Sequence, residues 1–213
     1  MSYTRRMRRS LLAVFFITLF SLATDATTVV PLSFEQLVTA SQSVVYGRVA
    51  DVRAQWTADR RFIESVVTVE ILRGMKGSAG ESIAFTVPGG QVGRYLNVIP
   101  GAPSFAPGDL AVFFLTAQGP RLPVTTGLTQ GIYRVQRDTS SGEMLVVPPV
   151  IDVAGRVVRG DVRRKPVPLS AFEGTVRAVA AIRQAQAGPD PSTSSGSSRA
   201  QSRDERSRGT GAR

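Results

Sequence analysis

The sequence predicts a mainly β fold: an OB-like antiparallel barrel of about five or six strands, with a short N-terminal helix and a C-terminal helix. Several segments between residues 43 and 147 alternate apolar and polar residues with a period of two, and glycine- or proline-rich turns separate them. In the first segment, 43–56, the apolar positions change face just after Gly47, which indicates a bulge or bend. A bent strand followed by an antiparallel meander is typical of the start of a small barrel.

The first 26 residues are typical of a secretory signal peptide. Four arginines lie between Arg5 and Arg9, an apolar run follows from Leu11 to Ala23, and small residues lead to Ala26. The run of about 13 residues is shorter than the roughly 20 that a membrane-spanning helix needs. We therefore expect cleavage near Ala26, export to the periplasm or the extracellular space, and no stable membrane anchor afterwards.

The expected elements of the domain, residues 27–187, begin with a helix of about two turns. Ser33 and Gln36 have the spacing of a capping box, and Phe34, Leu37 and Val38 share one face that should pack on the barrel. The expected strands follow at 43–56, 62–72, 83–87, 109–115, 132–137 and 144–147.

The strand at 109–115 is apolar on both faces, so it should lie centrally or be covered on its outer side by a helix or a loop. A second capping-box pattern, Ser170 with Glu173, predicts a helix that continues to about Ala187. Its expected apolar stripe is Phe172, Val176, Val179 and Ile182. Residues 188–213 are rich in Ser, Gly and Arg and contain no apolar side chain larger than alanine, so we expect a disordered tail.

The composition removes most common catalytic systems. There is no histidine and no cysteine, so catalytic triads, thiol nucleophiles and zinc sites of the usual kinds are absent, and the acidic residues are scattered singly. We expect no catalytic residue, no cofactor and no metal site. An unrecognised enzyme remains an alternative, in which GGQVG (89–93) would imitate a phosphate-binding loop; a turn that needs a positive φ at Gly89 or Gly90 is the favoured interpretation.

The candidate contact surface is the long loop at 88–107, which the sequence predicts to be irregular. Loops of this length in compact domains are uncommon and tend to be functional. The candidate contact residues are Arg94, Tyr95, Leu96, Val98, Ile99 and Phe105. They would bind another exported protein or a component of the cell envelope, or they would plug the mouth of the barrel. The oligomeric state is not predicted.

A basic face is the second candidate site. The net charge is +10, and the densest basic run of the domain lies within residues 150–168. Its members are Arg156, Arg159, Arg163, Arg164 and Lys165. Together with Arg48, Arg53 and Arg94 they could bind an anionic polymer, either a glycan or a nucleic acid. No aromatic residue lies among the arginines of the run to stack with a base or a sugar, which favours a solvated basic face.

Residues 32–136 contain the succession SxxVVYGRV, TVEILRGMKG, FTVPGGQVG, VIPGAPSFAPGD with FFL, and GLTQGIYRV. In these segments the chain resembles a group of small exported bacterial proteins without an assigned activity. More distantly, the layout is similar to the OB-fold of tissue inhibitors of metalloproteinases and netrin-like modules. That similarity implies a barrel and a protein-binding role, including an inhibitor-like one. Those inhibitors act through an N-terminal cysteine, and this chain contains none, so only the fold analogy applies.

Overall fold

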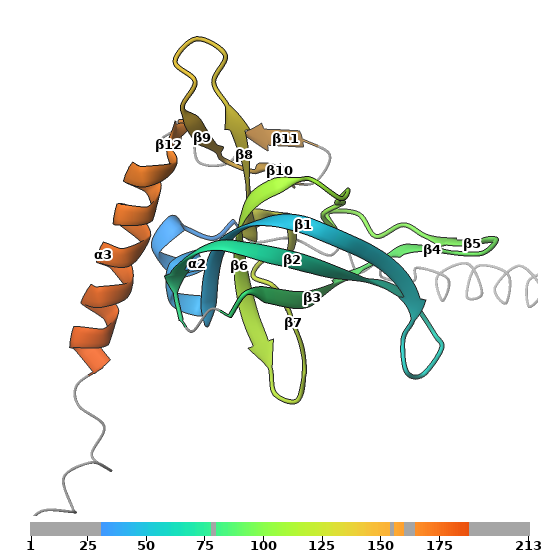
Figure 1. Cartoon of the computed structure of the whole chain (residues 1–213). Helices are drawn as coiled ribbons and strands as arrows, with labels where there is room; N and C mark the ends of the chain where they lie inside the picture. The colour runs from blue at the N-terminus through green and yellow to red at the C-terminus, as the bar shows by residue number, and fades with distance from the viewer. Residues whose placement is uncertain (1–30, 78–79, 154–155, 160–164, 188–213) are drawn as a thin grey trace, which may run out of the picture. The chain divides into compact units, whose positions relative to one another are not determined.

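The structure is a computed structural model that describes residues 31–77, 80–153, 156–159 and 165–187 (Figure 1). The predicted signal peptide at 1–26 and the predicted tail at 188–213 lie outside the described residues. The expected mainly β fold with a short N-terminal and a C-terminal helix is confirmed. The helices are α2 (Phe34–Ala40), the 3₁₀ helix η1 (Leu128–Gly131) and α3 (Leu169–Ala187).

The strands group around one sheet, with two small hairpins beside it. They are β1 (Ser43–Trp56), β2 (Ile63–Lys76), β3 (Ser82–Pro88), β4 (Gly90–Val92), β5 (Tyr95–Asn97), β6 (Leu110–Gln118), β7 (Arg121–Thr125), β8 (Ile132–Arg137), β9 (Met144–Val147), β10 (Val150–Val153), β11 (Arg156–Arg159) and β12 (Val167–Pro168).

Five strands pair in a closed ring, in the order β1-β2-β3-β7-β6 and back to β1. Every pairing in the ring is antiparallel except that of β3 with β7, which is parallel and rests on Thr86 opposite Val124. The expected antiparallel arrangement thus holds throughout the ring except at this seam. The strands expected at 132–137 and 144–147 exist as β8 and β9, but they extend the sheet outward from β6 and are not part of the ring.

Strand β1 has the predicted irregularity. Its register against β2 shifts three times between Val44 and Asp51, and its first half also pairs with β6. A Cβ atom at Gly47 would overlap the side chain of Val69 and the carbonyl of Glu70. The bend therefore needs glycine for close approach of the two backbones, and it lets β1 pair on both of its edges.

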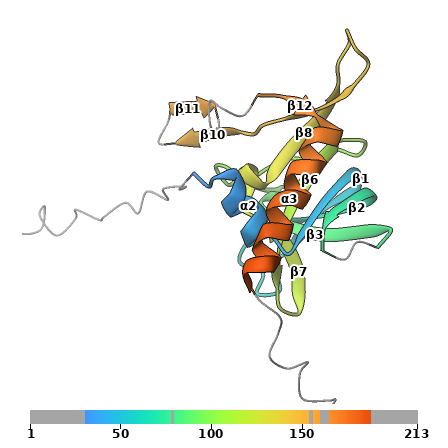
Figure 2. The ribbon, with the colours of Figure 1, turned by 90° about the vertical axis from the view of Figure 1, so that its left-hand side faces the viewer.

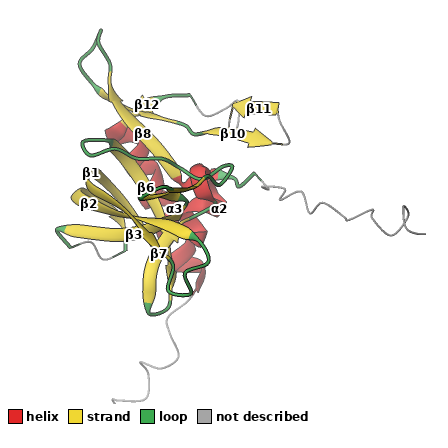
Figure 3. Ribbon diagram, turned by 90° about the vertical axis from the view of Figure 1, so that its right-hand side faces the viewer, coloured by secondary structure: helices red, strands yellow, loops and turns green. Residues whose placement is uncertain are grey.

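The two apolar faces of β6 belong to two different cores. Ala111, Phe113 and Leu115 join the cluster inside the ring. Val112 and Phe114 join a second cluster, which the helices complete. Figure 2 shows α3 and α2 over this outer face, and Figure 3 shows the ring from the opposite side. A helical cover explains why β6 is apolar on both faces, as the sequence analysis expected.

Helix α2 is fixed at both ends. Ser33 Oγ accepts a hydrogen bond from the Gln36 amide at 3.2 Å, and Gln36 Oε1 accepts one from the Ser33 amide at 2.7 Å, so the predicted capping box is present. At the other end, Lys76 Nζ donates to the carbonyl oxygens of Val38 and Ser41. A cation at the carboxyl end of a helix also complements the helix dipole.

Helix α3 ends at Ala187, as predicted, but its start differs from the prediction. It begins at Leu169, so Ser170 lies inside the helix and the expected capping box does not form. Glu173 instead binds Arg73 at 3.0 Å and Arg177 at 2.6 Å, which ties the helix to β2. Of the expected apolar stripe, Phe172 and Val176 are buried and Val179 is half-buried, whereas Ile182 is 60% exposed.

Candidate contact surface

The connection between β3 and β6 consists of two parts with different environments. The first part, 90–97, forms the β4–β5 hairpin, in which Gly90 pairs with Asn97 and Val92 with Tyr95. The second part, 98–107, has no regular secondary structure. Figure 1 shows the hairpin projecting from the end of the ring, near the turn that joins β1 and β2. The expectation that the whole loop is irregular is therefore wrong for its first half.

Glycines at the base of the hairpin hold it against the ring. Gly89 and Gly90 have φ of 94° and 140°, as the turn interpretation of GGQVG expected. A Cβ at Gly90 would lie 2.6 Å from Ser65 Oγ, so only glycine allows this approach. Ser65 Oγ donates to the Gly89 carbonyl at 2.8 Å, and the Gly89 amide donates to the Ile63 carbonyl at 2.9 Å. The hairpin thus begins from a fixed position.

The second part of the connection is anchored by Phe105. Its ring packs against Phe85 and Phe113, each with a centroid distance of 5.8 Å, and so adds to the core inside the ring. The Arg134 guanidinium lies 5.1 Å from the Phe105 ring centroid. Phe105 is half-buried and packs onto the core inside the ring, which agrees for this residue with the interpretation that the loop plugs the barrel.

Arg134 also fixes the backbone around Phe105. It forms an ion pair with Asp109 at 2.6 Å and donates to the Ser104 carbonyl at 2.5 Å, while Asp109 accepts from the Ala106 amide at 2.9 Å. Burial raises the pKa of the Asp109 carboxyl, but the Ala106 amide and the Arg134 guanidinium outweigh burial and hold the pKa below its ordinary value. The carboxylate form is thus the one that closes the loop.

The hairpin itself carries exposed apolar side chains. Tyr95, Leu96 and Val98 are 51%, 66% and 73% exposed. Trp56, at the end of β1, contacts the Tyr95 ring edge to face at a centroid distance of 5.5 Å. We refer to Trp56, Tyr95, Leu96 and Val98 as the hairpin surface. Phe62, 58% exposed, lies in the neighbouring turn between β1 and β2.

A groove lies on either side of the hairpin base. The first, of about 260 Å³, runs between Leu96, Val98 and Phe105. The second, of about 440 Å³, is lined by residues that include Phe62, Ile99 and Val124. Ile99 is half-buried and faces both grooves, so it forms part of their floor. The exposed hairpin residues are therefore bordered by concave surface.

The sequence analysis does not single out Trp56 or Phe62. They are only the last residue of the strand expected at 43–56 and the first residue of the strand expected at 62–72. The available signal is their position: large aromatic residues at both ends of the turn that joins β1 and β2. Exposed aromatic residues in such positions are common at interfaces.

The predicted basic residues that the structure describes have separate contacts, and most of the basic run has no described side chains. Arg48 and Arg53 form ion pairs with Glu70 at 3.5 Å and Asp51 at 2.8 Å. Arg94 lies over the Tyr95 ring, with its Cζ 5.2 Å from the centroid. Arg156 and Arg159 belong to β11, where side chains are not described, and Arg163 and Arg164 lie outside the described residues. Lys165 is described, and it is exposed.

Within the described residues, no three acidic side chains come together in a group that could hold a metal ion. In the same part of the chain, no helix has both the length and the apolar character needed to cross a membrane. The chain matches no family model and no curated protein sequence.

Proposed function

We propose that the domain is an exported, non-catalytic binding module that holds another protein through the hairpin surface. The observation that carries the proposal is the exposure of Tyr95, Leu96 and Val98 on and directly after one short projecting hairpin, with Trp56 of β1 packed against Tyr95 and Phe62 exposed in the neighbouring turn. Single exposed apolar residues are ordinary on protein surfaces, whereas a gathered patch is typical of an interaction site.

The rigidity of the hairpin base supports the same proposal. The two glycines and Ser65 hold the start of the hairpin, and Phe105 with Arg134 holds the segment that follows it. A surface that is ordered before binding loses less conformational entropy on association, so more of its contact energy appears as affinity. Aromatic residues bordered by pockets are also the residues that dominate many protein interfaces.

An anionic polymer fits this surface less well than a protein. Arg48 and Arg53 already face carboxylates, and Arg94 covers the tyrosine ring that a base or a sugar would need for stacking. A polymer site would need unpaired cations interleaved with open aromatic faces. The hairpin surface instead presents aliphatic side chains at its most exposed positions, Leu96 and Val98.

Site-specific photo-cross-linking in the exporting cell tests the proposal. A photoreactive amino acid at Leu96 is expected to give one discrete protein adduct, and the same group at Leu122 is expected to give none. Leu122 is the matched control because it is an exposed leucine of β7, outside the hairpin. Adding Val98→Asp should remove the adduct at position 96, because a charge cannot be buried in an apolar interface without a large desolvation cost.

Two results would overturn the proposal. Equal labelling from positions 96 and 122 would show that the hairpin is not selective. Binding of the purified chain to lipid vesicles that disappears in Leu96→Asp, without any protein adduct, would show that the hairpin surface contacts a membrane.

A further inference from the structure

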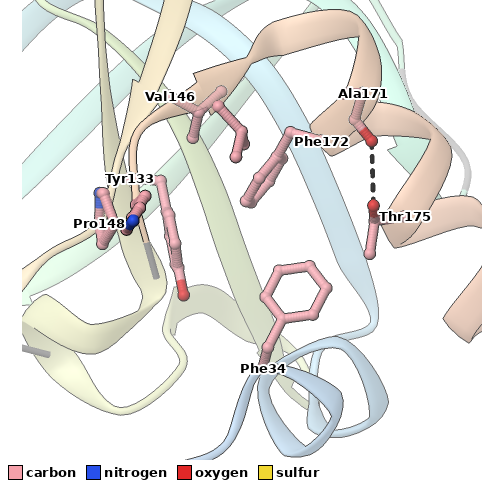
Figure 4. A pocket seen from close by; sticks show the side chains of 9 residues that line it. Phe34, Tyr133, Val146, Pro148, Ala171, Phe172 and Thr175 are labelled. Atoms are coloured by element: carbon pink, nitrogen blue, oxygen red, sulfur yellow. Dashed lines mark hydrogen bonds between the residues drawn. The ribbon is translucent and has the colours of Figure 1, made fainter. Parts of the chain in front are cut away.

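A small apolar pocket lies where α2, α3, β8 and β9 meet (Figure 4). Its volume is about 190 Å³. The wall consists of aromatic and aliphatic side chains together with one lysine. The lining residues are Phe34, Tyr133, Val146, Phe172, Lys165 and Thr175, with Pro148, Val167 and Ala171 completing the wall. This pocket is separate from the hairpin surface, and the inference below does not depend on the proposed function.

Three aromatic rings define the inside of the pocket. The ring centroids of Phe34 and Phe172 are 5.4 Å apart, those of Tyr133 and Phe172 are 5.1 Å apart, and those of Phe34 and Tyr133 are 6.4 Å apart. Figure 4 shows the three rings around one space, with Thr175 at its edge. The Thr175 hydroxyl donates to the Ala171 carbonyl at 3.0 Å, so its hydrogen-bond donor is already used within the helix.

The size of the pocket limits what it can hold. An apolar cavity of about 150 Å³ is large enough to bind benzene, so a slightly larger one accommodates a single six-membered ring or a short acyl chain. Aromatic rings on three sides favour a flat or aliphatic group, because such a group loses water-exposed apolar surface and can stack against the rings.

The charge at the pocket selects the polar end of the ligand. Among the described lining residues, Lys165 is the only one with a charge, and it is exposed. The amino-terminal turn of α3, which begins at Leu169, contributes Ala171 to the wall and contains no acidic residue. The positive end of the helix dipole and the lysine ammonium therefore both favour a negative group here. Glu173, further along the helix, is engaged by Arg73 and Arg177.

We propose that this pocket binds a small aromatic or short-chain carboxylate, with its apolar group between the rings and its carboxylate at Lys165. The ring of the ligand lies against Phe34, Tyr133 and Phe172. The ammonium of Lys165 stays at the water-exposed rim, so the charged pair does not have to be fully desolvated.

Calorimetric titration of the purified full chain tests the charge requirement. The probe is 3-phenylpropanoate, and its neutral isostere is 3-phenylpropanamide. The acid is expected to bind about tenfold more tightly than the amide, which is the usual effect of one charged hydrogen bond. Lys165→Gln should remove most of this difference. Arg183→Gln, which changes an exposed cation of α3 that does not line the pocket, should leave it intact.

The position of the aromatic ring is tested separately. Ala171→Leu should fill the pocket and abolish binding of both probes, and Ala181→Leu, at an exposed position of the same helix, should not. In the wild-type chain, nuclear Overhauser contacts are expected between the probe's ring protons and those of Phe34, Tyr133 or Phe172. This second measurement decides the question even if Ala171→Leu fails to fold.

Three results would overturn the proposal. The first is equal affinity for the acid and the amide in the wild-type chain. The second is contacts from the probe ring to other residues only. The third is the absence of saturable binding of 3-phenylpropanoate at millimolar concentration.

Discussion

The two halves of the connection between β3 and β6 contain similar residues in opposite environments. Tyr95 and Leu96, in the hairpin half, are more than half exposed, whereas Phe105, in the following half, lies among the phenylalanines of the core. The difference arises from what supports each half: backbone pairing and glycine contacts hold the hairpin, and a side-chain anchor holds the rest. One loop can therefore seal a barrel and present a contact surface at the same time.

The largest expected loss of stability comes from truncating Phe105, the anchor of the second half of the connection. Phe105→Ala removes a ring that packs on Phe85 and Phe113, so we expect a loss of about 3 kcal/mol in the free energy of unfolding, as is usual for truncation of a packed phenylalanine. Urea denaturation followed by tryptophan fluorescence or circular dichroism measures it. A change below about 0.5 kcal/mol, the size of an ordinary surface effect, would show that Phe105 is not an anchor.

A smaller loss of stability is expected when the ion pair between Arg134 and Asp109 is removed. Arg134→Met removes the contacts to Asp109, Ser104 and Phe105, and we expect a loss of about 1 kcal/mol, because a charged hydrogen bond is weakened where both partners are partly exposed. The control is Arg48→Met, whose pair with Glu70 is longer and more exposed and should contribute nothing measurable. Equal losses in the two variants would contradict the special role of Arg134.

The contribution of Asp109 to the stability of the fold should depend on pH. The pKa of Asp109 is lowered from 3.8 in the folded chain, so its carboxylate stabilises the fold above the unfolded-state value, and this contribution is lost as the pH falls through the folded-state pKa. The stability difference between wild type and Asp109→Asn should thus be constant near neutral pH and shrink below about pH 4. Parallel denaturation series at several pH values measure it; a difference that widens in acid would refute the assignment.

The smallest loss of stability is expected for a substitution in the exposed hairpin half of the connection. Tyr95→Ala loses an edge contact with Trp56 and little buried surface, so we expect a change of about 0.5 kcal/mol in the free energy of unfolding. The measurement is the same urea denaturation as for Phe105→Ala. Destabilisation equal to that of Phe105→Ala would show that the hairpin is part of the core, and the hairpin surface would lose its basis.

Regular patterns made much of the fold predictable. The alternation in β2 and the two-sided β6 identified strands because side chains in a strand point to opposite faces in turn. The pair Ser33 and Gln36 identified the start of α2 because its capping depends only on neighbouring residues. The structure of these elements can be predicted from residues that are close together in the sequence.

Features that depend on distant partners were missed. Strand β7 contains Pro123, which is unusual within a strand, so its sequence does not indicate a strand. Its pairing with β3 through a single parallel residue pair has no local sequence signal either. Ser170 and Glu173 have capping spacing, but Arg73 of β2 engages the glutamate instead. The candidate site was predicted as a range, 88–107. Its division into hairpin and anchor depends on contacts with Phe85, Phe113 and Arg134, which lie outside that range.

The sharing of β6 between two cores has a consequence during synthesis. All strands of the ring precede residue 126, whereas α3, which covers Val112 and Phe114, begins at Leu169. A chain that ends before α3 would have a closed ring with an apolar outer face exposed to water. Such a surface is prone to self-association. We expect a chain truncated after Pro168 to aggregate at concentrations where the full chain stays monodisperse in light scattering. Helix α3 would then act as an intramolecular chaperone for β6.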